Sequence, residues 1–379
     1  MRKKMYSIIL VICIFCMSML TQAAAAPKEV DKELAAYIQQ LFSDRAQFLI
    51  HRDKDSLDRH YVSSIATSRN AMRHETDRAE YVQAWAERRG IQFVDATSHV
   101  RIIRINKQKD KAYISTVESL KLDYTYIHSM MPVQSFGIGT RHALTLTKTD
   151  GKWQLLREWY LDPLEENPKL IPDSDGMILS SDRHIESSEL GKESAGSNTT
   201  RKYNRDKAVA YANKYAGAAW GAGNKHRYHP NYRDYTGLGG DCTNFASQCI
   251  GDREEGGGLR MRGGWRHFQY VGGSRTWVQT DAFKDFLLSS GYGSLIARGS
   301  FQEIVTANER HPSGAIAKLR PGDLIAYMLR GDVDHFSIVV GFDMNGYPLV
   351  NSHTADRYRV PFDLGWDKHT TYLLIQIRD

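Results

Sequence analysis

Residues 166–202 divide the chain, because this stretch lacks the composition of a compact domain. It contains no aromatic residue and is rich in serine and in charged side chains. Such a segment buries too little apolar surface to offset the entropy that is lost on ordering. The sequence therefore predicts a flexible linker over 166–200, between one domain at 27–165 and a second at 201–379. A length of 379 residues is also typical of two domains rather than one.

The first 26 residues have the features of a secretory signal peptide. Basic residues at positions 2–4 precede an apolar run at 8–20, and alanines at 23–26 stand before Pro27. This order predicts cleavage after Ala26. A membrane anchor is the alternative, but a span needs roughly 20 apolar residues. We expect a secreted or cell-wall-associated protein with no stable membrane span after cleavage.

The charge balance points to no particular partner. Removing the three basic residues of the leader lowers the formal net charge from +6 to +3. That value is compatible with an anionic cell wall, and it does not require nucleic acid as a partner. We therefore expect no nucleic-acid binding.

The segment at 27–165 has the pattern of an α+β domain. Helical spacing from Leu34 to Phe48 and at 81–89 precedes alternating, strand-like runs at 100–106, 112–126, 136–148 and 153–161. Helices first and an antiparallel sheet afterwards resemble nuclear transport factor 2-like cones. That resemblance implies a binding or dimerising module, and no catalytic cluster is expected here.

Cys242 is the strongest candidate for chemistry in the chain. It follows the turn Gly239-Gly240-Asp241 and opens a helical pattern, and His335 opens an apolar strand about ninety residues later. A thiol at the first turn of a helix and a histidine on a strand are the two halves of a thiol-nucleophile site. The helix dipole and a nearby imidazolium favour the thiolate, so we expect Cys242 to have a lowered pKa.

The other cysteines are expected to be inert. Cys13 and Cys16 lie in the leader and leave with it, whereas Cys249 lies seven positions after Cys242 on the same helix. That spacing separates the two Cα atoms by roughly 10 Å, which is too far for a disulfide. Cys249 is therefore expected to be a buried core thiol.

Four sequence motifs carry a resemblance to a known family. They are Tyr203-Asn204-Arg205, the octapeptide Asp241-Cys242-Thr243-Asn244-Phe245-Ala246-Ser247-Gln248, Pro321-Gly322-Asp323-Leu324-Ile325, and Asp334-His335. In this order they resemble the bacterial "putative amidase" domain family, which is similar to the NlpC-type and CHAP cell-wall peptidases. The resemblance covers roughly residues 201–379 and departs from the family in a Gly- and Arg-rich insertion at 252–264.

The resemblance implies a papain-like α+β fold, in which a helix with the nucleophile packs on an antiparallel sheet with the histidine. It also implies a cysteine-dependent amide hydrolase that acts on a peptide or on peptidoglycan. Cys242 would attack the carbonyl, His335 would transfer the proton, and the Cys242 backbone N–H would stabilise the oxyanion. We expect Asp241 to cap the helix and Asn244 to support the site.

The residue that orients His335 depends on strand register. The candidates on the following strand are Asn351, His353 and Asp356. A two-residue turn at Asn345-Gly346 places Asp356 opposite His335, whereas an odd loop or a bulge brings Asn351 and His353 to its face. The family resemblance favours His353 as the third catalytic residue, with Asn351 and Asp356 in supporting roles.

Three alternatives to a cysteine hydrolase remain open. A zinc hydrolase could use Cys242, His335, His353 and Asp356, but their spacing is not a zinc motif, so we expect no metal or other cofactor. A non-catalytic wall-binding module would need neither the thiol nor the imidazole. A transglutaminase-like acyl transferase would use both, with an amine as the acceptor. Trp220, Trp265 and Trp277 could line a substrate groove or belong to the core.

Overall fold

The computed structural model describes residues 31–127, 130–164, 167–184 and 203–378. The predicted signal peptide and residues 185–202 of the predicted linker lie outside these ranges. The chain forms two compact units, 1–36 and 37–379, and all contacts discussed below lie within the second. The described part of the first unit, residues 31–36, contains the start of helix α2. No helix among the described residues is long and apolar enough to cross a membrane.

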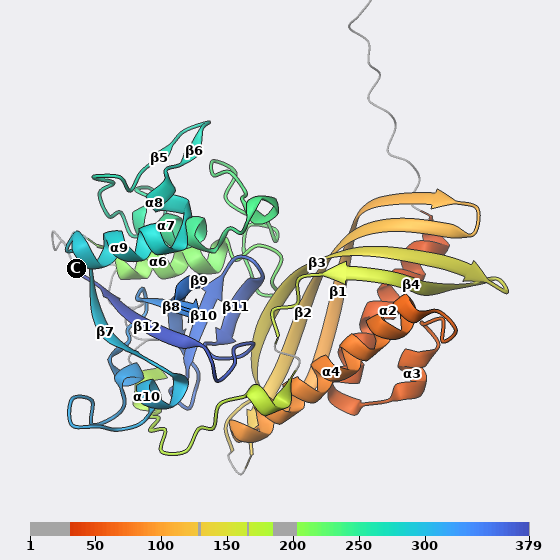
Figure 1. Ribbon diagram of the computed structural model, residues 1–379, viewed down its shortest axis with the longest axis horizontal. Helices are drawn as coiled ribbons and strands as arrows, with labels where there is room; N and C mark the ends of the chain where they lie inside the picture. Colours follow the sequence, from red (N-terminus) through yellow and green to blue (C-terminus); the bar gives the residue numbers. More distant parts are fainter. Residues whose placement is uncertain (1–30, 128–129, 165–166, 185–202, 379) are drawn as a thin grey trace, which may run out of the picture. The chain divides into compact units, whose positions relative to one another are not determined.

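The first half of the second unit places helices against one face of an antiparallel sheet (Figure 1). The helices are α2 (Lys32–His51), α3 (Lys54–Asp58) and α4 (Ala66–Arg88). The strands are β1 (Ile91–Gln108), β2 (Lys111–Tyr126), β3 (Gln134–Thr149) and β4 (Lys152–Tyr160). Strands β2 and β3 alternate buried and exposed positions over much of their length, because one face packs on the helices.

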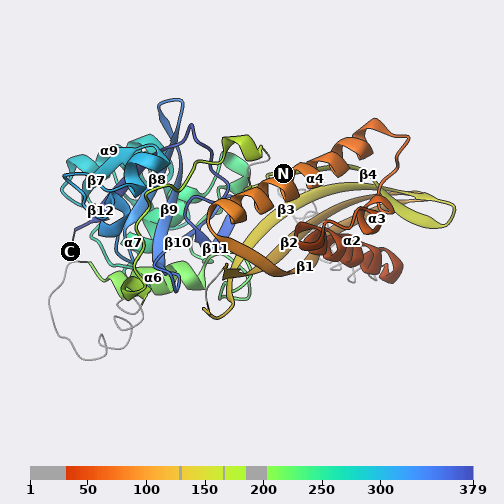
Figure 2. The ribbon, with the colours of Figure 1, turned by 90° about the horizontal axis from the view of Figure 1, so that it is seen from below.

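The second half surrounds a further set of antiparallel strands with helices (Figures 1 and 2). Its helices are α6 (Arg205–Lys214), α7 (Cys242–Gly251), α8 (Arg275–Val278), α9 (Thr280–Ser289) and α10 (Phe301–Val305). Its strands are β5 (His267–Phe268), β6 (Gly272–Gly273), β7 (Gly293–Gly299), β8 (Leu324–Leu329), β9 (Asp332–Phe342), β10 (Pro348–Ser352), β11 (Asp356–Pro361) and β12 (Thr371–Ile377). One apolar core packs α6, α7 and α9 on the sheet, and a second core includes α10 and the other sheet face.

Strands from both halves form one sheet. Its order is β1-β2-β3-β11-β10-β9-β8-β12-β7, with β4 added beside β3. The junction is the antiparallel pair β3–β11, in which Asp356 lies opposite Gly139. Further contacts across the junction are buried: the Arg89 guanidinium donates to Asp363 at 2.6 Å, and Trp85 Nε1 donates to the same carboxylate at 3.0 Å.

Two glycines of β3 allow the second half to approach the strand backbone. A Cβ on Gly137 would lie 2.1 Å from the Trp220 carbonyl oxygen, and a Cβ on Gly139 would lie 2.6 Å from the Ala218 carbonyl carbon. Any side chain at either position would displace the loop that follows α6. The close approach therefore depends on glycine at both positions.

The structure confirms the expectation of a mixed α+β fold with a large antiparallel sheet. Strands β7 and β11 are additions, since neither was expected from the sequence. The described part of the predicted linker contacts the rest of the protein: Arg183 donates to the Leu319 carbonyl at 3.0 Å, and Lys368 N donates to the Leu170 carbonyl at 2.7 Å. The boundaries 27–165, 166–200 and 201–379 stay a prediction.

Candidate functional site

Two of the four sequence motifs, at 203–205 and 321–325, hydrogen-bond α6 to the start of β8. Asn204 caps α6, because its side chain accepts a hydrogen bond from Lys207 N at 2.9 Å. Arg205 donates to the Asp323 carboxylate at 2.7 Å, and the Tyr203 hydroxyl donates to the Gly322 carbonyl at 2.7 Å. Burial raises the pKa of Asp323, and Arg205 opposes that shift. Two of the sequence motifs thus have a structural role.

Cys242 is the first residue of α7, as the sequence predicts. Its two preceding glycines, Gly239 and Gly240, have φ values of 106° and 121°, a backbone region that favours glycine. The cysteine side chain is nearly buried, since Cys242 is only 7 % accessible. The first turn of the helix packs into the protein instead of facing solvent.

The thiol reaches the strand that carries His335. Helix α7 packs on β9, and the backbone of Phe336, the residue that follows His335, favours the thiolate of Cys242. Burial raises the pKa of Cys242, the Asp241 charge adds to this effect, and the contacts with Phe336 and Thr243 oppose it. The lowered pKa expected from the helix start is therefore wrong for this conformation, because desolvation of the thiolate outweighs those contacts.

His335 is a buried, neutral imidazole. It lies opposite Tyr327 of β8, with ring centroids 5.9 Å apart, and its ring lies 5.5 Å from that of Trp366. Burial lowers its pKa to about 3, and the charges of Arg357 and His353 act in the same direction. Its Nε2 atom is buried and has no hydrogen-bond partner among the described residues. An imidazole in this state can accept a proton.

The connection between β9 and β10 contains both an odd-length loop and a bulge, the two features that the sequence left open. Five residues connect β9 to β10, and the pairing shifts by one residue between Leu349 and Val350. As a result Asn351 pairs with Ile338, and the Asn351 amide donates to Asn213 of α6 at 3.0 Å. The two offsets together turn Asn351 toward the helices instead of toward His335.

His353 has partners other than His335. Its Nδ1 lies 2.6 Å from Asp241 Oδ2, and its Nε2 lies 2.7 Å from the Tyr215 carbonyl oxygen. The ring stacks between Tyr228 and Phe245, with centroid distances of 3.7 and 3.9 Å. Since both nitrogens face acceptors, only the doubly protonated imidazolium satisfies both contacts.

Asp241 does not cap α7, contrary to expectation. No capping hydrogen bond from its side chain is present, because the carboxylate turns toward His353 and toward the preceding loop. Asp241 Oδ1 accepts from Tyr235 N and from the Asn244 amide, both at 2.9 Å. The carboxylate thus ties the turn before Cys242 to the strand end at His353.

Asn244 and Asp356 also have defined partners. The Asn244 side chain accepts from Trp277 Nε1 at 2.9 Å and donates to the Arg233 carbonyl at 3.0 Å. Asp356 accepts from Ala218 N at 2.7 Å and from the Tyr228 hydroxyl, and the Arg141 guanidinium lies 3.4 Å from its carboxylate, so these groups are its partners. Both residues order loops around the site.

Cys249 and two of the three tryptophans that could line a groove are part of the core, whereas Trp220 is 36 % accessible. Trp265 and Trp277 are both fully buried, so neither lines a groove. Cys249 is fully buried as well, and burial raises the pKa of its thiol well above the usual range. The described residues contain no cluster of three or more His, Cys, Asp or Glu side chains placed to hold a metal ion.

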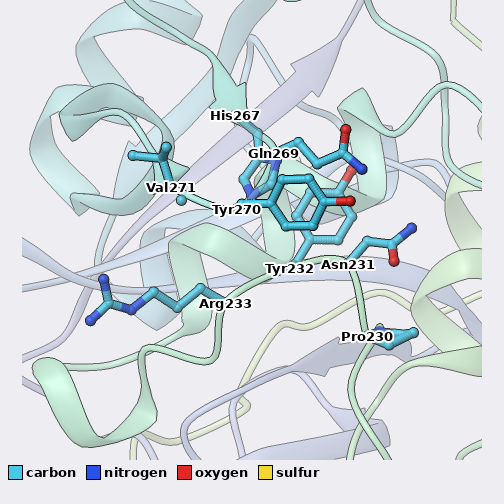
Figure 3. Close-up of a pocket in the computed structure, with 9 residues that line it drawn as sticks. Pro230, Asn231, Tyr232, Arg233, His267, Gln269, Tyr270 and Val271 are labelled. Atoms are coloured by element: carbon cyan, nitrogen blue, oxygen red, sulfur yellow. The ribbon is translucent and has the colours of Figure 1, made fainter. Parts of the chain in front are cut away.

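A pocket adjoins the loop that leads to Cys242 (Figure 3). It has a volume of about 420 Å³ and lies between residues 230–233 and the β5–β6 hairpin. Arg233 and Tyr270 are exposed on opposite walls, and Tyr270 is 96 % accessible. Both walls are hydrogen-bonded to segments that flank Cys242. The Arg233 carbonyl of one wall accepts from the Asn244 amide, and Gly273 N of the hairpin donates to the Tyr235 hydroxyl. The sequence shows this loop only as an aromatic, glycine-broken stretch, with no signal for a pocket.

Comparisons with solved structures find partial, low-identity matches. A putative scytalone dehydratase from Novosphingobium aromaticivorans is 19% identical, with 34% of this chain and 82% of that chain covered and a TM-score of 0.24. The dehydrochlorinase LinA-type3 from Novosphingobium barchaimii is 16% identical, with 34% and 86% covered and a TM-score of 0.23. Bd1075 from Bdellovibrio bacteriovorus is 12% identical, with 34% and 38% covered and a TM-score of 0.21. These matches leave the activity of the chain unassigned.

One family model covers the segment that contains Cys242 and His335. No curated protein sequence matches the chain. Residues 202–375, less than half of the chain, match the family described as "Putative amidase domain". The match supports amide hydrolysis as the general activity of this segment.

Proposed function

We propose that the segment 203–378 is a cysteine-dependent amide hydrolase with a papain-like arrangement, in which Cys242 is the nucleophile and His335 the proton carrier. The observation that carries the proposal is the position of Cys242 at the start of α7, which packs on β9, the strand that contains His335. The two residues lie far apart in sequence, and the proposed chemistry requires them as neighbours.

The resting pair is a neutral thiol and a neutral imidazole. Burial disfavours both the thiolate of Cys242 and the imidazolium of His335. His335 therefore acts as a general base: it takes the thiol proton as sulfur forms a bond to the amide carbonyl carbon. The carbonyl π electrons move to oxygen, and the backbone N–H groups of the first turn of α7 stabilise this oxyanion.

The second half of the reaction returns the proton. The His335 imidazolium protonates the leaving nitrogen, the C–N bond breaks, and a thioester remains on Cys242. Water then attacks the thioester while His335 accepts its proton, and the departing sulfur takes that proton back. The products are an amine and a carboxylic acid, with the thiol and imidazole restored.

His353 has a positioning role in this proposal instead of a catalytic one. Its two contacts, to Asp241 and to Tyr215, fix the turn before Cys242. Its charge also lowers the pKa of His335, which keeps that imidazole in the base form. The orienting partner of His335 Nε2 would then come from the substrate or from water, since no described residue supplies it.

The substrate is proposed to carry an acidic group beside the scissile amide. Arg233 is exposed on the wall of the pocket and forms no ion pair among the described residues. A guanidinium binds carboxylates in a bidentate fashion, and Tyr270 and Gln269 offer further contacts on the opposite wall. The predicted signal peptide and the family resemblance together favour a peptide of the cell wall as the substrate. The segment 31–164 is proposed to be a cone-like accessory domain.

The proposal is tested by product analysis with the full-length protein. We expect cell-wall peptides to be cleaved with release of a new amine, and Cys242→Ser and His335→Gln each to lower kcat by about a thousandfold or more. Cys249→Ala is the matched control, because it removes a thiol from the same helix. Retained activity in folded Cys242→Ser would refute the nucleophile, and a product joined to an added amine would indicate acyl transfer in place of hydrolysis.

A further inference from the structure

The outer face of the first four strands, opposite α2 and α4, carries two aligned rows of side chains. One row crosses the strands as Arg104, Ser115, Ala143 and Trp159, and the next as Asn106, Tyr113, Thr145 and Arg157. Within each row the residues are direct cross-strand neighbours, so their side chains lie on the same face. Three strand spacings separate the row ends by roughly 14 Å.

These eight residues, with the backbone between them, line a hollow of about 450 Å³. We refer to it as the outer-face hollow. Its shape follows from side-chain size, since the small Ser115 and Ala143 lie between Arg104 and Trp159 in one row. Trp159 is 68 % accessible and Tyr113 is 44 % accessible, so two aromatic rings border the hollow.

The charge of the outer-face hollow is positive. Arg104 and Arg157 are exposed, and neither forms an ion pair with any described residue. The one acid at its border, Glu158, turns to the opposite face of the sheet, where it accepts from Arg45 and contacts His142 at 2.8 Å. Two free guanidinium groups therefore face the hollow without a compensating carboxylate.

We propose that the outer-face hollow binds a carboxylate-bearing glycan. Exposed indole and phenol rings offer flat apolar faces with a polar edge, which suit the C–H face of a sugar ring. Arg104 and Arg157 match carboxylates at two points along the chain, and Asn106, Ser115 and Thr145 supply side-chain donors and acceptors for hydroxyl groups. Trp, Tyr and Arg are also the residues that dominate binding energy at interfaces.

Charge complementarity favours this occupant over two others. A nucleic acid presents a phosphate at every nucleotide and needs a run of cations, whereas this hollow has two. A second copy of the chain would have to place two like-charged arginine pairs close together in a symmetric contact, which is unfavourable. The proposal does not depend on hydrolysis by the Cys242 site, so the two can fail separately.

The test measures binding by titration calorimetry with the full-length protein. The probes are a uronic-acid oligosaccharide and the same oligosaccharide with its carboxylates reduced to alcohols. We expect the uronate form to bind about tenfold more tightly. Arg104→Gln and Arg157→Gln should each remove most of that preference, whereas Trp159→Ala should weaken both probes by a similar factor. Lys54→Gln on α3 is the charge-matched control and should change neither affinity.

Three results would overturn the proposal. The first is equal affinity of the wild-type protein for the charged and reduced probes. The second is unchanged uronate binding in Arg157→Gln and Trp159→Ala proteins that remain folded by circular dichroism. The third is competition by a single-stranded oligonucleotide at lower concentration than the uronate, or a wild-type dimer in ultracentrifugation that Trp159→Ala converts to monomer, since these would identify a different occupant.

Discussion

Asp241 and His353, 112 positions apart in sequence, are joined by a contact of 2.6 Å between Oδ2 and Nδ1, and both side chains are 1 % accessible. The contact links the residue before the candidate nucleophile to the end of β10. Removing one partner would leave the other as an unpaired polar or charged group in the interior, which is strongly destabilising. The pair is therefore the most sensitive structural contact of the site.

We expect His353→Gln to lower the free energy of unfolding by about 3 kcal/mol, because Asp241 loses its charged partner. Asp241→Asn should cost a similar amount, and the double variant should cost clearly less than the sum. Urea denaturation of the four proteins gives the coupling free energy. Strictly additive losses would show that the two side chains do not interact. In the wild type, nitrogen NMR of the His353 ring should show two N–H groups.

The thiol of Cys242 is expected to react slowly with iodoacetamide at neutral pH. Burial raises its pKa, so the thiolate fraction at pH 7 is smaller than that of a free cysteine. The rate should rise toward alkaline pH, with a midpoint above the free value of about 8.5. Peptide mass mapping follows each cysteine, and fully buried Cys249 serves as the unreactive control. A midpoint below that of free cysteine would instead support an ion pair between a Cys242 thiolate and an imidazolium.

His335 should make the protein less stable as the pH falls from 7 to 5. The unfolded chain protonates this histidine near pH 6.5, whereas the folded protein resists protonation down to about 3. Stability is thus lost between pH 6.5 and 3 and is regained as the pH rises. The expected contribution is about 2 kcal/mol between pH 7 and 5. Denaturant titrations of wild type and His335→Gln should differ in pH dependence by this amount, and parallel curves would contradict the assigned pKa direction.

Arg233 should control the preference for acidic substrates without entering the chemistry. For substrates that differ only in a carboxylate or carboxamide beside the scissile bond, we expect the wild type to have about a tenfold lower KM for the carboxylate. Arg233→Gln should abolish this preference and leave kcat unchanged, and Arg233→Lys should retain part of it. An Arg233→Gln protein with the full preference would exclude the pocket as the recognition site.

Gly139→Ala tests the close approach between β3 and the loop after α6. The added Cβ would lie 2.6 Å from backbone atoms at 218–219, so we expect a loss of about 2–3 kcal/mol in the free energy of unfolding. Gly237→Ala is the matched control, since its Cβ would meet no heavy atom within 4 Å. Equal stability of the two variants would show that the loop moves away from the strand at little cost.

Local patterns in the sequence predicted most of the elements that hold the site. The helix predicted after Cys242, the strand predicted at His335 and the strand that follows it correspond to α7, β9 and β10, because periodicity and glycine turns are local signals. The Cys242 turn was found for the same reason. Strands β7 and β11 were missed, since their sequences lack a clear alternation of apolar and polar residues.

The contacts of the site could not be read from the sequence. Whether Asn351 and His353 share the face of His335 depends on a loop length and a bulge that act in opposite senses, and sequence alone does not set either. The partners of His353, Asp241 and Tyr215, lie on segments more than a hundred positions away. The sign of the Cys242 pKa shift depends on burial, which the helix-start argument does not contain.

The buried pair of Arg89 and Asp363 has a consequence for how the chain reaches its native state. These residues are 274 positions apart, and the carboxylate is fully buried between Arg89, Trp85 and Tyr347. During synthesis Arg89 is made long before Asp363, so the N-terminal half cannot bury the Arg89 guanidinium with its partner until the C-terminal half has been made. Contacts of such long separation slow the final step of folding, and a fragment that ends before Asp363 would leave a buried cation without its partner. The two halves are thus expected to fold together, as one cooperative event after Asp363 has been synthesised.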